Sequence, residues 1–250
     1  MMKKRILIGV AAVALIIVAI FVFRLQFSKP PSKFLTAQEI KTEINEVYQN
    51  SEISEVQDVI FINDRNVFVP LLLDDGNYGS AAWTWKSSEN WQLQSFDLIG
   101  SPRLWKIGDE EGYFIWNMPP DEQVAGINFY MIRDRNAWVS GGTPFYLPRI
   151  QMEHHIPYEK NGYGVYEMPK EWMKLTKQLS ENEAGRTDQL FQSMFSHNEL
   201  VQFGWRTVDH EGQLKDIKQD NHISGGFAYS SSPDFHFVFP LHEGEVESGK

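Results

Sequence analysis

The sequence predicts an α+β fold that is mostly β: an N-terminal transmembrane helix, then one ectodomain built on an antiparallel β meander, sandwich- or barrel-like, with two or three flanking helices. Three observations predict it. The chain opens with an uncharged apolar run, its middle alternates aromatic and β-branched segments with turn residues, and two or three segments repeat apolar residues at helical spacing. The roughly 220 residues beyond the apolar run are enough to bury one sizeable core.

The apolar run at residues 6–23 has the length of a membrane-spanning helix. Its eighteen residues rise about 1.5 Å each and make a helix of roughly 27 Å, close to the hydrocarbon thickness of a bilayer. Lys3, Lys4 and Arg5 precede the run, so the positive-inside rule keeps residues 1–5 in the cytoplasm and sends the rest across. The sequence therefore predicts a single-pass signal anchor in the cell membrane, with an extracytoplasmic C-terminal domain.

A cleaved signal peptide and a soluble protein with a buried N-terminal helix are the alternatives to an anchor. Signal peptides have apolar regions of roughly 7–15 residues that end at a small-x-small site. Here the only such site, Ala12-Val13-Ala14, lies in the middle of the run, and the run ends in bulky residues. The chain has no cysteine, which excludes lipoprotein acylation. These features favour an uncleaved anchor.

Residues 24–35 form the expected linker, a short extended spacer that contains two prolines, and residues 36–250 form the ectodomain. The ectodomain begins with a helix at 36–50, where Thr36 and Glu39 form a capping box. Further helices are expected at 170–183 and 187–195. The residues expected to face the sheet are Ile40, Ile44, Trp172, Leu175 and Leu179.

Consecutive antiparallel strands are expected between residues 56 and 152, with later strands at 200–209 and 235–241. Turn signals such as Asp75-Gly76, Gly108-Asp109 and Gly141-Gly142 fall between short apolar runs at the spacing typical of a meander. The expected strands are "DVIFIN", "NVFVPLLL", "GSAAWTWKS", "WQLQSFDLI", "RLWKIG", "EGYFIWNM", "AGINFYMIR", "NAWVSGG" and "FYLPRIQM".

Two similar phrases, "INDRNVFV" at 62–69 and "IRDRNAWV" at 132–139, each place Asp-Arg-Asn between apolar runs. Asp favours the first position of a turn, and Asn tolerates the left-handed conformation that a three-residue hairpin loop needs at its end. The similarity does not extend beyond the phrases, which argues against a duplicated domain. We therefore expect two hairpin turns, rather than a shared functional loop.

Charge and cysteine content exclude several classes of function. Residues 1–23 hold three basic and no acidic residues, so the remainder has 20 Lys and Arg against 33 Asp and Glu, a net charge of −13. Such an acidic domain repels phosphate backbones and anionic lipid headgroups, so no nucleic-acid partner is expected. The absence of cysteine excludes thiolate zinc sites and cysteine nucleophiles.

Histidines and carboxylates gather in two places, "MEHHIPYEK" (152–160) and "VDHEG" (208–212). Neither has the His-x-x-x-His spacing of a helical zinc site, and in an extended strand His154 and His155 point to opposite faces. A metal site assembled from distant segments is the alternative to solvated loop residues. The residues concerned are Glu153, His154, His155, Glu159, Asp209, His210, Glu211, His222, His236 and His242.

The motifs of nucleophilic, phosphate and dinucleotide chemistry are absent from the sequence. The Gly pairs in "SGGTPF" (140–145) and "SGGF" (224–227) are interpreted as turns, and Asp74-Asp75 and Glu110-Glu111 as solvated loop carboxylates. No catalytic, cofactor-binding or metal-binding residue and no cofactor is predicted. Whether the chain is an enzyme stays open, with a non-enzyme favoured.

Tryptophan is the feature above background, with eight in the chain. Trp83 and Trp85 alternate with Thr84, so a strand places both indoles on one face. Because the opposite face ends in Lys86, we expect the tryptophans to face the core. The alternative is an exposed face that stacks on sugar rings or a peptide.

The layout resembles that of single-pass, cysteine-free envelope proteins of Gram-positive bacteria: a basic tail, an anchor and an acidic ectodomain. The resemblance rests on the first thirty residues and carries over no functional residue. The sequence thus favours a membrane-anchored extracytoplasmic binding or accessory protein, held in the bilayer by residues 6–23, that contacts a wall component or another envelope protein. The rival is an envelope hydrolase whose metal or carboxylate site combines distant His, Asp and Glu residues.

Overall fold

The computed structural model describes residues 31–49, 53–86, 90–108, 111–184, 201–215 and 229–247. The tail, the anchor and most of the linker expected before residue 36 lie outside these ranges, as does the short helix expected at 187–195. Within the described ranges, no helix is both long and apolar enough to cross a membrane.

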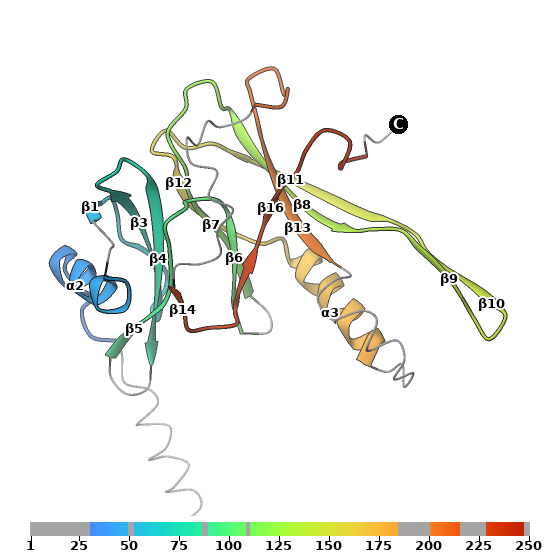
Figure 1. Ribbon diagram of the computed structural model, residues 1–250, viewed down its shortest axis with the longest axis horizontal. Helices are drawn as coiled ribbons and strands as arrows, with labels where there is room; N and C mark the ends of the chain where they lie inside the picture. The colour runs from blue at the N-terminus through green and yellow to red at the C-terminus, as the bar shows by residue number, and fades with distance from the viewer. Residues whose placement is uncertain are drawn as a thin grey trace, which may run out of the picture.

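The described residues form two helices and a succession of strands (Figure 1). The helices are α2 (Ala37–Val47) and α3 (Lys170–Ala184). The strands are β1 (Ile53–Val56), β2 (Ile60–Asn63), β3 (Asn66–Leu73), β4 (Tyr78–Lys86), β5 (Asn90–Asp97), β6 (Arg103–Ile107), β7 (Glu111–Asn117), β8 (Gly126–Arg133), β9 (Asn136–Ser140), β10 (Thr143–Leu147), β11 (Ile150–Pro157), β12 (Tyr163–Glu167), β13 (Gln202–Val208), β14 (Tyr229–Ser230), β15 (Phe235–Phe237) and β16 (Phe239–Pro240).

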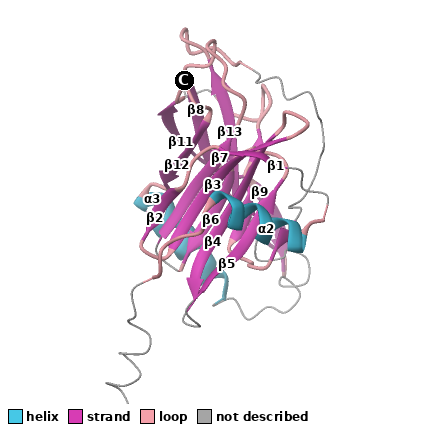
Figure 2. Ribbon diagram, turned by 90° about the vertical axis from the view of Figure 1, so that its left-hand side faces the viewer, coloured by secondary structure: helices cyan, strands magenta, loops and turns pink. Residues whose placement is uncertain are grey.

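The strands form three sheets and a separate two-stranded ribbon. The first sheet has the order β1-β3-β4-β5-β14, with β2 also paired to β3; the second is β12-β7-β6-β15, and the third is β11-β8-β13-β16. The ribbon is β10-β9. Among the described strands every pair is antiparallel except β13 with β16. The expected β-rich α+β fold with antiparallel sheets is confirmed, although the strands are divided among several sheets (Figure 2).

Helix α2 covers one face of the first sheet. The expected capping box is present, because the Thr36 backbone N–H donates to Glu39 at 2.7 Å and the Thr36 hydroxyl accepts from the Glu39 N–H. Ile40 and Ile44 are fully buried, in one cluster with Trp83 of β4. The expectation that this helix packs on the sheet, and that Trp83 faces the core, is confirmed.

Pro70 lies in the middle of β3, where a strand with neighbours on both sides normally needs a backbone N–H. The neighbour changes at this residue: β2 pairs with β3 up to Phe68, and β1 pairs with it from Leu71 onward. The Pro70 carbonyl still accepts from the Gln57 N–H at 3.0 Å. The N–H that proline lacks therefore falls at the gap between the short edge strands β2 and β1.

The second sheet is buried on both faces. Trp105 and Ile115 pack with Phe68 of the first sheet, whereas Phe114 lies in the cluster that holds Phe129 of the third sheet. Helix α3 closes this second cluster with Trp172, whose ring is 6.2 Å from that of Phe114. Strands β6 and β7 therefore alternate apolar side chains toward two neighbouring layers.

Hydrogen bonds and an ion pair join the first sheet to the second. The Asn117 amide of β7 donates to the carbonyls of Leu71 (2.8 Å) and Gly79 (2.6 Å). The Arg103 guanidinium of β6 forms an ion pair with Asp97 of β5 at 2.6 Å, and both side chains are almost fully buried. These contacts specify how the sheets stack, which apolar packing alone does not.

The two Asp-Arg-Asn phrases differ in structure. The first is a turn, because Asp64-Arg65 connects β2 to β3, and the Asn63 side chain accepts from the Arg65 N–H at 2.9 Å. The prediction of a second hairpin turn was wrong: Asp134-Arg135 only interrupts a strand that continues from β8 into β9. Residue 133 is Arg where residue 63 is Asn. Arg133 cannot close a turn as Asn63 does.

A candidate interaction site on a projecting hairpin arm

A long hairpin arm projects from the third sheet (Figure 1). It consists of β8 and β9 on one side and β10 and β11 on the other, paired from Gly126–Pro157 out to Ser140–Thr143. The third strand β13 pairs with β8 only as far as Ile132. Beyond that residue the arm is a two-stranded ribbon, and no other strand of the described residues pairs with either of its edges.

The turn of the arm lies at the expected Gly141-Gly142. Their φ angles are +56° and +82°, and two consecutive residues at positive φ make the type I′ turn whose twist matches a two-residue hairpin. Residues that carry a side chain rarely adopt a positive φ, so the two glycines allow the chain to reverse direction here. The interpretation of these glycines as a turn is confirmed.

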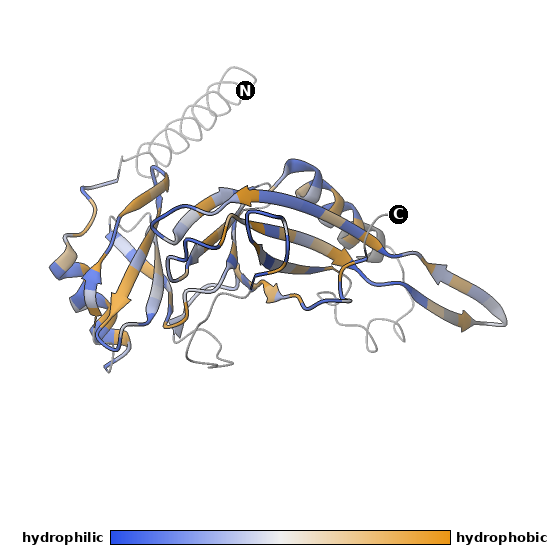
Figure 3. Cartoon of the chain, turned by 90° about the horizontal axis from the view of Figure 1, so that it is seen from above, coloured by the Kyte–Doolittle hydropathy of each residue, from blue (hydrophilic) through white to orange (hydrophobic). Residues whose placement is uncertain are grey.

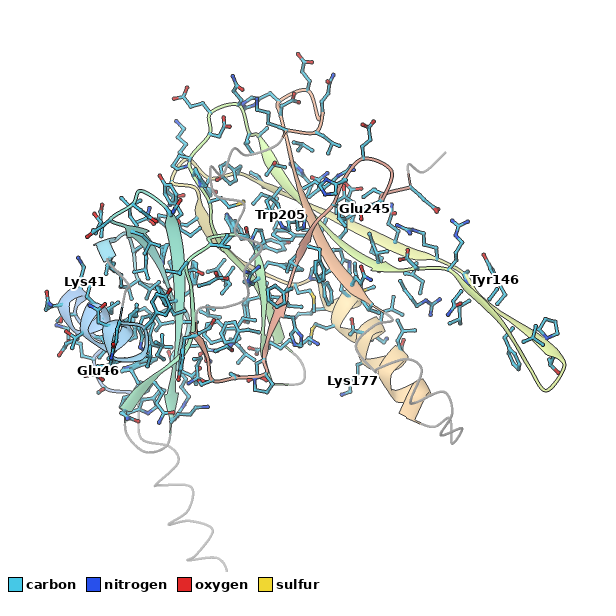
Figure 4. All side chains as sticks on the ribbon, in the orientation of Figure 1. Lys41, Glu46, Tyr146, Lys177, Trp205 and Glu245 are labelled. Carbon is cyan, nitrogen blue, oxygen red and sulfur yellow. The ribbon has the colours of Figure 1, made fainter. Side chains whose placement is uncertain are left out.

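The tip of the arm, residues 136–147, exposes large apolar side chains. Val139 is 70% exposed, Tyr146 64% and Phe145 41%. Val139 lies opposite Pro144, and Tyr146 opposite Ala137, so these four share one face, whereas Phe145 is on the other. Figures 3 and 4 show the apolar residues along the ribbon and the place of Tyr146 on it. Both faces of the tip are therefore apolar and accessible.

The base of the arm is held by polar contacts with Arg149 at their centre. Its guanidinium pairs with Asp134 across the arm and donates to the Glu245 carbonyl and to Gln151, the last at 3.2 Å. Its side chain is only 15% exposed, although that of Asp134 is 64% exposed. Arg133 adds a bond from its guanidinium to the Pro148 carbonyl at 2.9 Å. These contacts fix the point where the ribbon leaves the sheet.

The C-terminal segment 241–247 lies against the base of the arm (Figure 4). Gln151 makes two hydrogen bonds to the backbone of Glu247, at 2.8 and 2.9 Å, and the Glu247 carboxylate pairs with Arg135. Leu241 lies so close to Gly204 of β13 that a Cβ there would meet its Cγ at 2.5 Å. The arm is thus supported by its own sheet and by a distant part of the chain.

The structure places His154 and His155 on opposite faces of β11, as expected. His154 shares a hydrogen bond of 2.5 Å with the Tyr166 hydroxyl, and the two rings are stacked. His155 shares a bond of 2.7 Å with the Asn128 side chain, whose amide donates to Glu153 at 2.6 Å. These residues hold neighbouring strands together, so each is engaged with protein partners.

The remaining polar candidates are dispersed. Asp209 accepts the N–H groups of Glu211 and Gln213, both at 2.9 Å, and shapes a turn. His210 contacts the Glu122 carbonyl at 3.2 Å. Burial lowers the pKa of His236, and the nearby Lys106 contributes.

Across the described part of the chain, no three His, Cys, Asp or Glu side chains lie close enough to hold a metal ion. His222 and Glu110 are outside the described residues.

Sequence reasoning predicted the two strands of the tip and its turn but missed Val139, Phe145 and Tyr146 as exposed residues. One feature of the sequence could have indicated the exposed tip. The twelve residues 136–147 carry no charged side chain, whereas Arg135 precedes them and Arg149 follows them. The apolar content alone favoured a buried strand, because large apolar side chains are most often found in the protein interior.

No protein-family model matches this chain, and neither a curated protein nor a solved structure matches it. The candidate site therefore rests on the arm itself. Its base is held by polar contacts, and its tip, residues 136–147, is uncharged and exposes apolar side chains on both faces, which suits contact with another surface.

Proposed function

We propose that this chain is a membrane-anchored extracytoplasmic binding or accessory protein of the cell envelope, and that the tip of the arm is its contact surface. The observation that carries the proposal is the exposure of Val139, Phe145 and Tyr146 on a projecting ribbon. Full burial of a large apolar side chain contributes roughly 1.5–3 kcal/mol. Three such residues therefore favour contact with an apolar surface.

The construction of the arm supports the same proposal. Arg149 and Gln151 tie its base to the third sheet and to the C-terminal segment, so the ribbon is held before any contact forms. A contact surface that is already ordered loses less conformational entropy on binding than a flexible loop does. An arm that served only to fill the core would have its tip buried.

A photo-reactive amino acid at the tip tests this function in intact cells. A benzophenone side chain replaces Tyr146 in one variant and Asp75, in the β3–β4 turn of the first sheet, in a matched control. After irradiation we expect adducts from residue 146 and none from residue 75. Equal adduct formation at both positions, or none at residue 146, would contradict the arm as the contact surface.

The anchored topology has its own test. Residues 6–23 are proposed to hold the chain in the cell membrane with residues 1–5 in the cytoplasm. Protease added to wall-stripped cells is expected to digest the ectodomain, and the chain should stay in the membrane after an alkaline carbonate wash. A protected C-terminus, or a mature N-terminus that begins after Arg24, would refute this topology.

A further inference from the structure

A partner that covers the tip of the arm has to contact both of its faces, because both faces carry exposed apolar side chains. Val139 and Tyr146 point to one side of the ribbon and Phe145 to the other. A flat protein surface would cover one face and leave the other in water. A fluid apolar medium, or a closed cleft, covers both.

Addition of a partner strand to the edge of the ribbon is disfavoured at β10. Pro144 lies in this edge strand and has no N–H to donate to a neighbouring strand. Such pairing would also leave the exposed side chains of both faces in water, because an added strand buries backbone rather than faces.

A second copy of the chain is disfavoured by charge. The chain has a net charge of −10, so two copies repel each other overall. At the base of the arm, the exposed Asp134 and Glu247 are paired with Arg149 and Arg135, so the repulsion comes from the charge of the whole chain. The same charge disfavours an anionic lipid surface, but it does not disfavour a zwitterionic one.

The dimensions of the tip match shallow insertion into a bilayer. At about 3.4 Å per residue, Phe145 lies about 10 Å and Tyr146 about 14 Å from the glycine turn. Amphipathic segments bury their apolar groups about 5–10 Å into the boundary between headgroups and acyl chains. Insertion to this depth would cover Val139 and Phe145, place Tyr146 at the headgroups, where tyrosine is enriched, and leave Arg135, about 20 Å from the turn, in water.

The open edges of the ribbon set a limit to the depth. Backbone N–H and C=O groups without hydrogen-bond partners are costly in the hydrocarbon core, whereas lipid headgroups and their water can still form hydrogen bonds with them. Pro144 removes one such donor near the turn. A tip of this construction is therefore suited to the interfacial zone and unsuited to crossing the bilayer.

We propose that the tip of the arm inserts into the interfacial zone of a lipid bilayer with zwitterionic headgroups, which makes the bilayer the occupant of the contact surface. This inference rests on the proposed function for the role of the arm. The tip lies at the end of the molecule opposite α2, where the described chain begins (Figure 1). Residues 24–30 span at most about 25 Å, so an anchor at residues 6–23 would keep the ectodomain close to the membrane. Insertion at both ends would lay the ectodomain along the bilayer.

The chain has no cysteine, so a single introduced cysteine takes one label without background. The full-length chain, with Val139→Cys or Thr143→Cys, is labelled with the environment-sensitive fluorophore NBD and reconstituted into phosphatidylcholine vesicles. A second preparation contains phosphatidylcholine with a nitroxide on the acyl chain. We expect the label at either position to emit at shorter wavelength and to be quenched by the nitroxide, whereas a label at Asp75→Cys stays unquenched.

A combined replacement of the apolar side chains completes the test. Phe145→Ser with Tyr146→Ser, read out by the label at residue 143, should abolish the quenching, and replacing part of the lipid with phosphatidylglycerol should weaken it. An unquenched label at residues 139 and 143 would overturn the inference, as would quenching that survives the two serines. Excimer formation between pyrene-labelled copies without quenching would identify a second copy as the occupant, and would likewise overturn it.

The two proposals fail differently. If the photo-reactive residue at position 146 forms adducts with a protein in cells while the vesicle label stays unquenched, the bilayer inference fails and the proposed function stands. If position 146 forms no adduct of any kind in cells, the proposed function fails. Lipid adducts at position 146 together with quenching in vesicles would support both.

Discussion

The indole nitrogen of Trp83 donates a hydrogen bond of 2.8 Å to the carboxylate of Glu43, which joins strand β4 to helix α2. The bond lies beside an apolar interface in which Trp83, Ile40 and Ile44 are all fully buried. Apolar packing holds the helix on the sheet, and the hydrogen bond satisfies an indole N–H that burial would otherwise leave without a partner. The contact spans forty residues of sequence, so it links the start of the domain to its first sheet.

Replacing this tryptophan should destabilise the domain strongly. Trp83→Ala removes a large, fully buried side chain between α2 and the first sheet, and such truncations cost about 3–5 kcal/mol, a large share of the roughly 5–15 kcal/mol that stabilises a domain. Urea unfolding of residues 31–250, followed by circular dichroism, should show this loss or the variant should fail to accumulate as soluble protein. Tyr146→Ala, at the exposed tip, is the matched control and should change the free energy of unfolding little. A Trp83→Ala variant as stable as the parent would refute the core role of this residue.

Glu43 should make stability depend on pH. Burial raises the pKa of Glu43, the hydrogen bond from Trp83 opposes that rise, and the nearby Glu46 and Glu39 add to it. The folded state therefore binds this proton more tightly than the unfolded state, so its contribution to stability is lost as pH rises from the ordinary carboxyl range through the raised pKa. Glu43→Gln keeps an acceptor for Trp83 but does not titrate. The free energy of unfolding of Glu43→Gln, relative to that of the parent, should therefore increase between pH 4 and pH 7. Urea unfolding at each pH measures this difference. A difference that stays constant would contradict a raised pKa of Glu43.

The two Asp-Arg-Asn phrases show where sequence reasoning succeeds and where it fails. Local chemistry decides the first, because the side chain of Asn63 closes the turn between β2 and β3. At the second, Arg133 reaches the Pro148 carbonyl across the arm, and the strand continues until Gly141-Gly142 reverses it. The residue before the shared phrase is among the differences between the two copies, so a comparison of residues 63 and 133 would have indicated that the second copy lacks the side chain that closes the first turn.

Strand identity was predictable from the sequence, but sheet membership was not. The alternation of apolar residues marks most of β2 to β11, and α2 and α3 follow from their periodicity and caps. How strands divide among sheets depends on contacts distant in sequence, such as those of Asn117 with Leu71 and Gly79. The exposure of Phe145 depends on the same information, since it follows from β13 ending its pairing at Ile132.

The buried ion pair between Asp97 and Arg103 should be sensitive to the loss of one partner. Burial raises the pKa of Asp97, and the guanidinium 2.6 Å away opposes that rise. Asp97→Asn would remove the carboxylate that pairs with the buried Arg103 guanidinium, and removing one partner of a buried pair costs about 3–5 kcal/mol. Replacing both residues, Asp97→Leu with Arg103→Met, should recover a large part of this loss in urea unfolding. A double variant no more stable than Asp97→Asn would show that the pair is required for the stacking of the two sheets.

The ion pairs at the base of the arm should affect local motion more than global stability. Arg149 joins the arm to the C-terminal segment, but its partners Asp134 and Glu247 are largely exposed, and exposed pairs are typically worth about 0–1 kcal/mol. Arg149→Met should therefore change the free energy of unfolding by less than about 1 kcal/mol. The same change removes the bond to the Glu245 carbonyl and should release the base of the ribbon, so amide hydrogen exchange across residues 130–153 should become faster while exchange in β3 and β4 stays the same. Arg135→Met, which removes a single exposed pair, is the matched control and should produce a smaller effect. If amide hydrogen exchange across residues 130–153 is the same in Arg149→Met as in the parent, the pairing of β8 with β11 alone holds the ribbon in place.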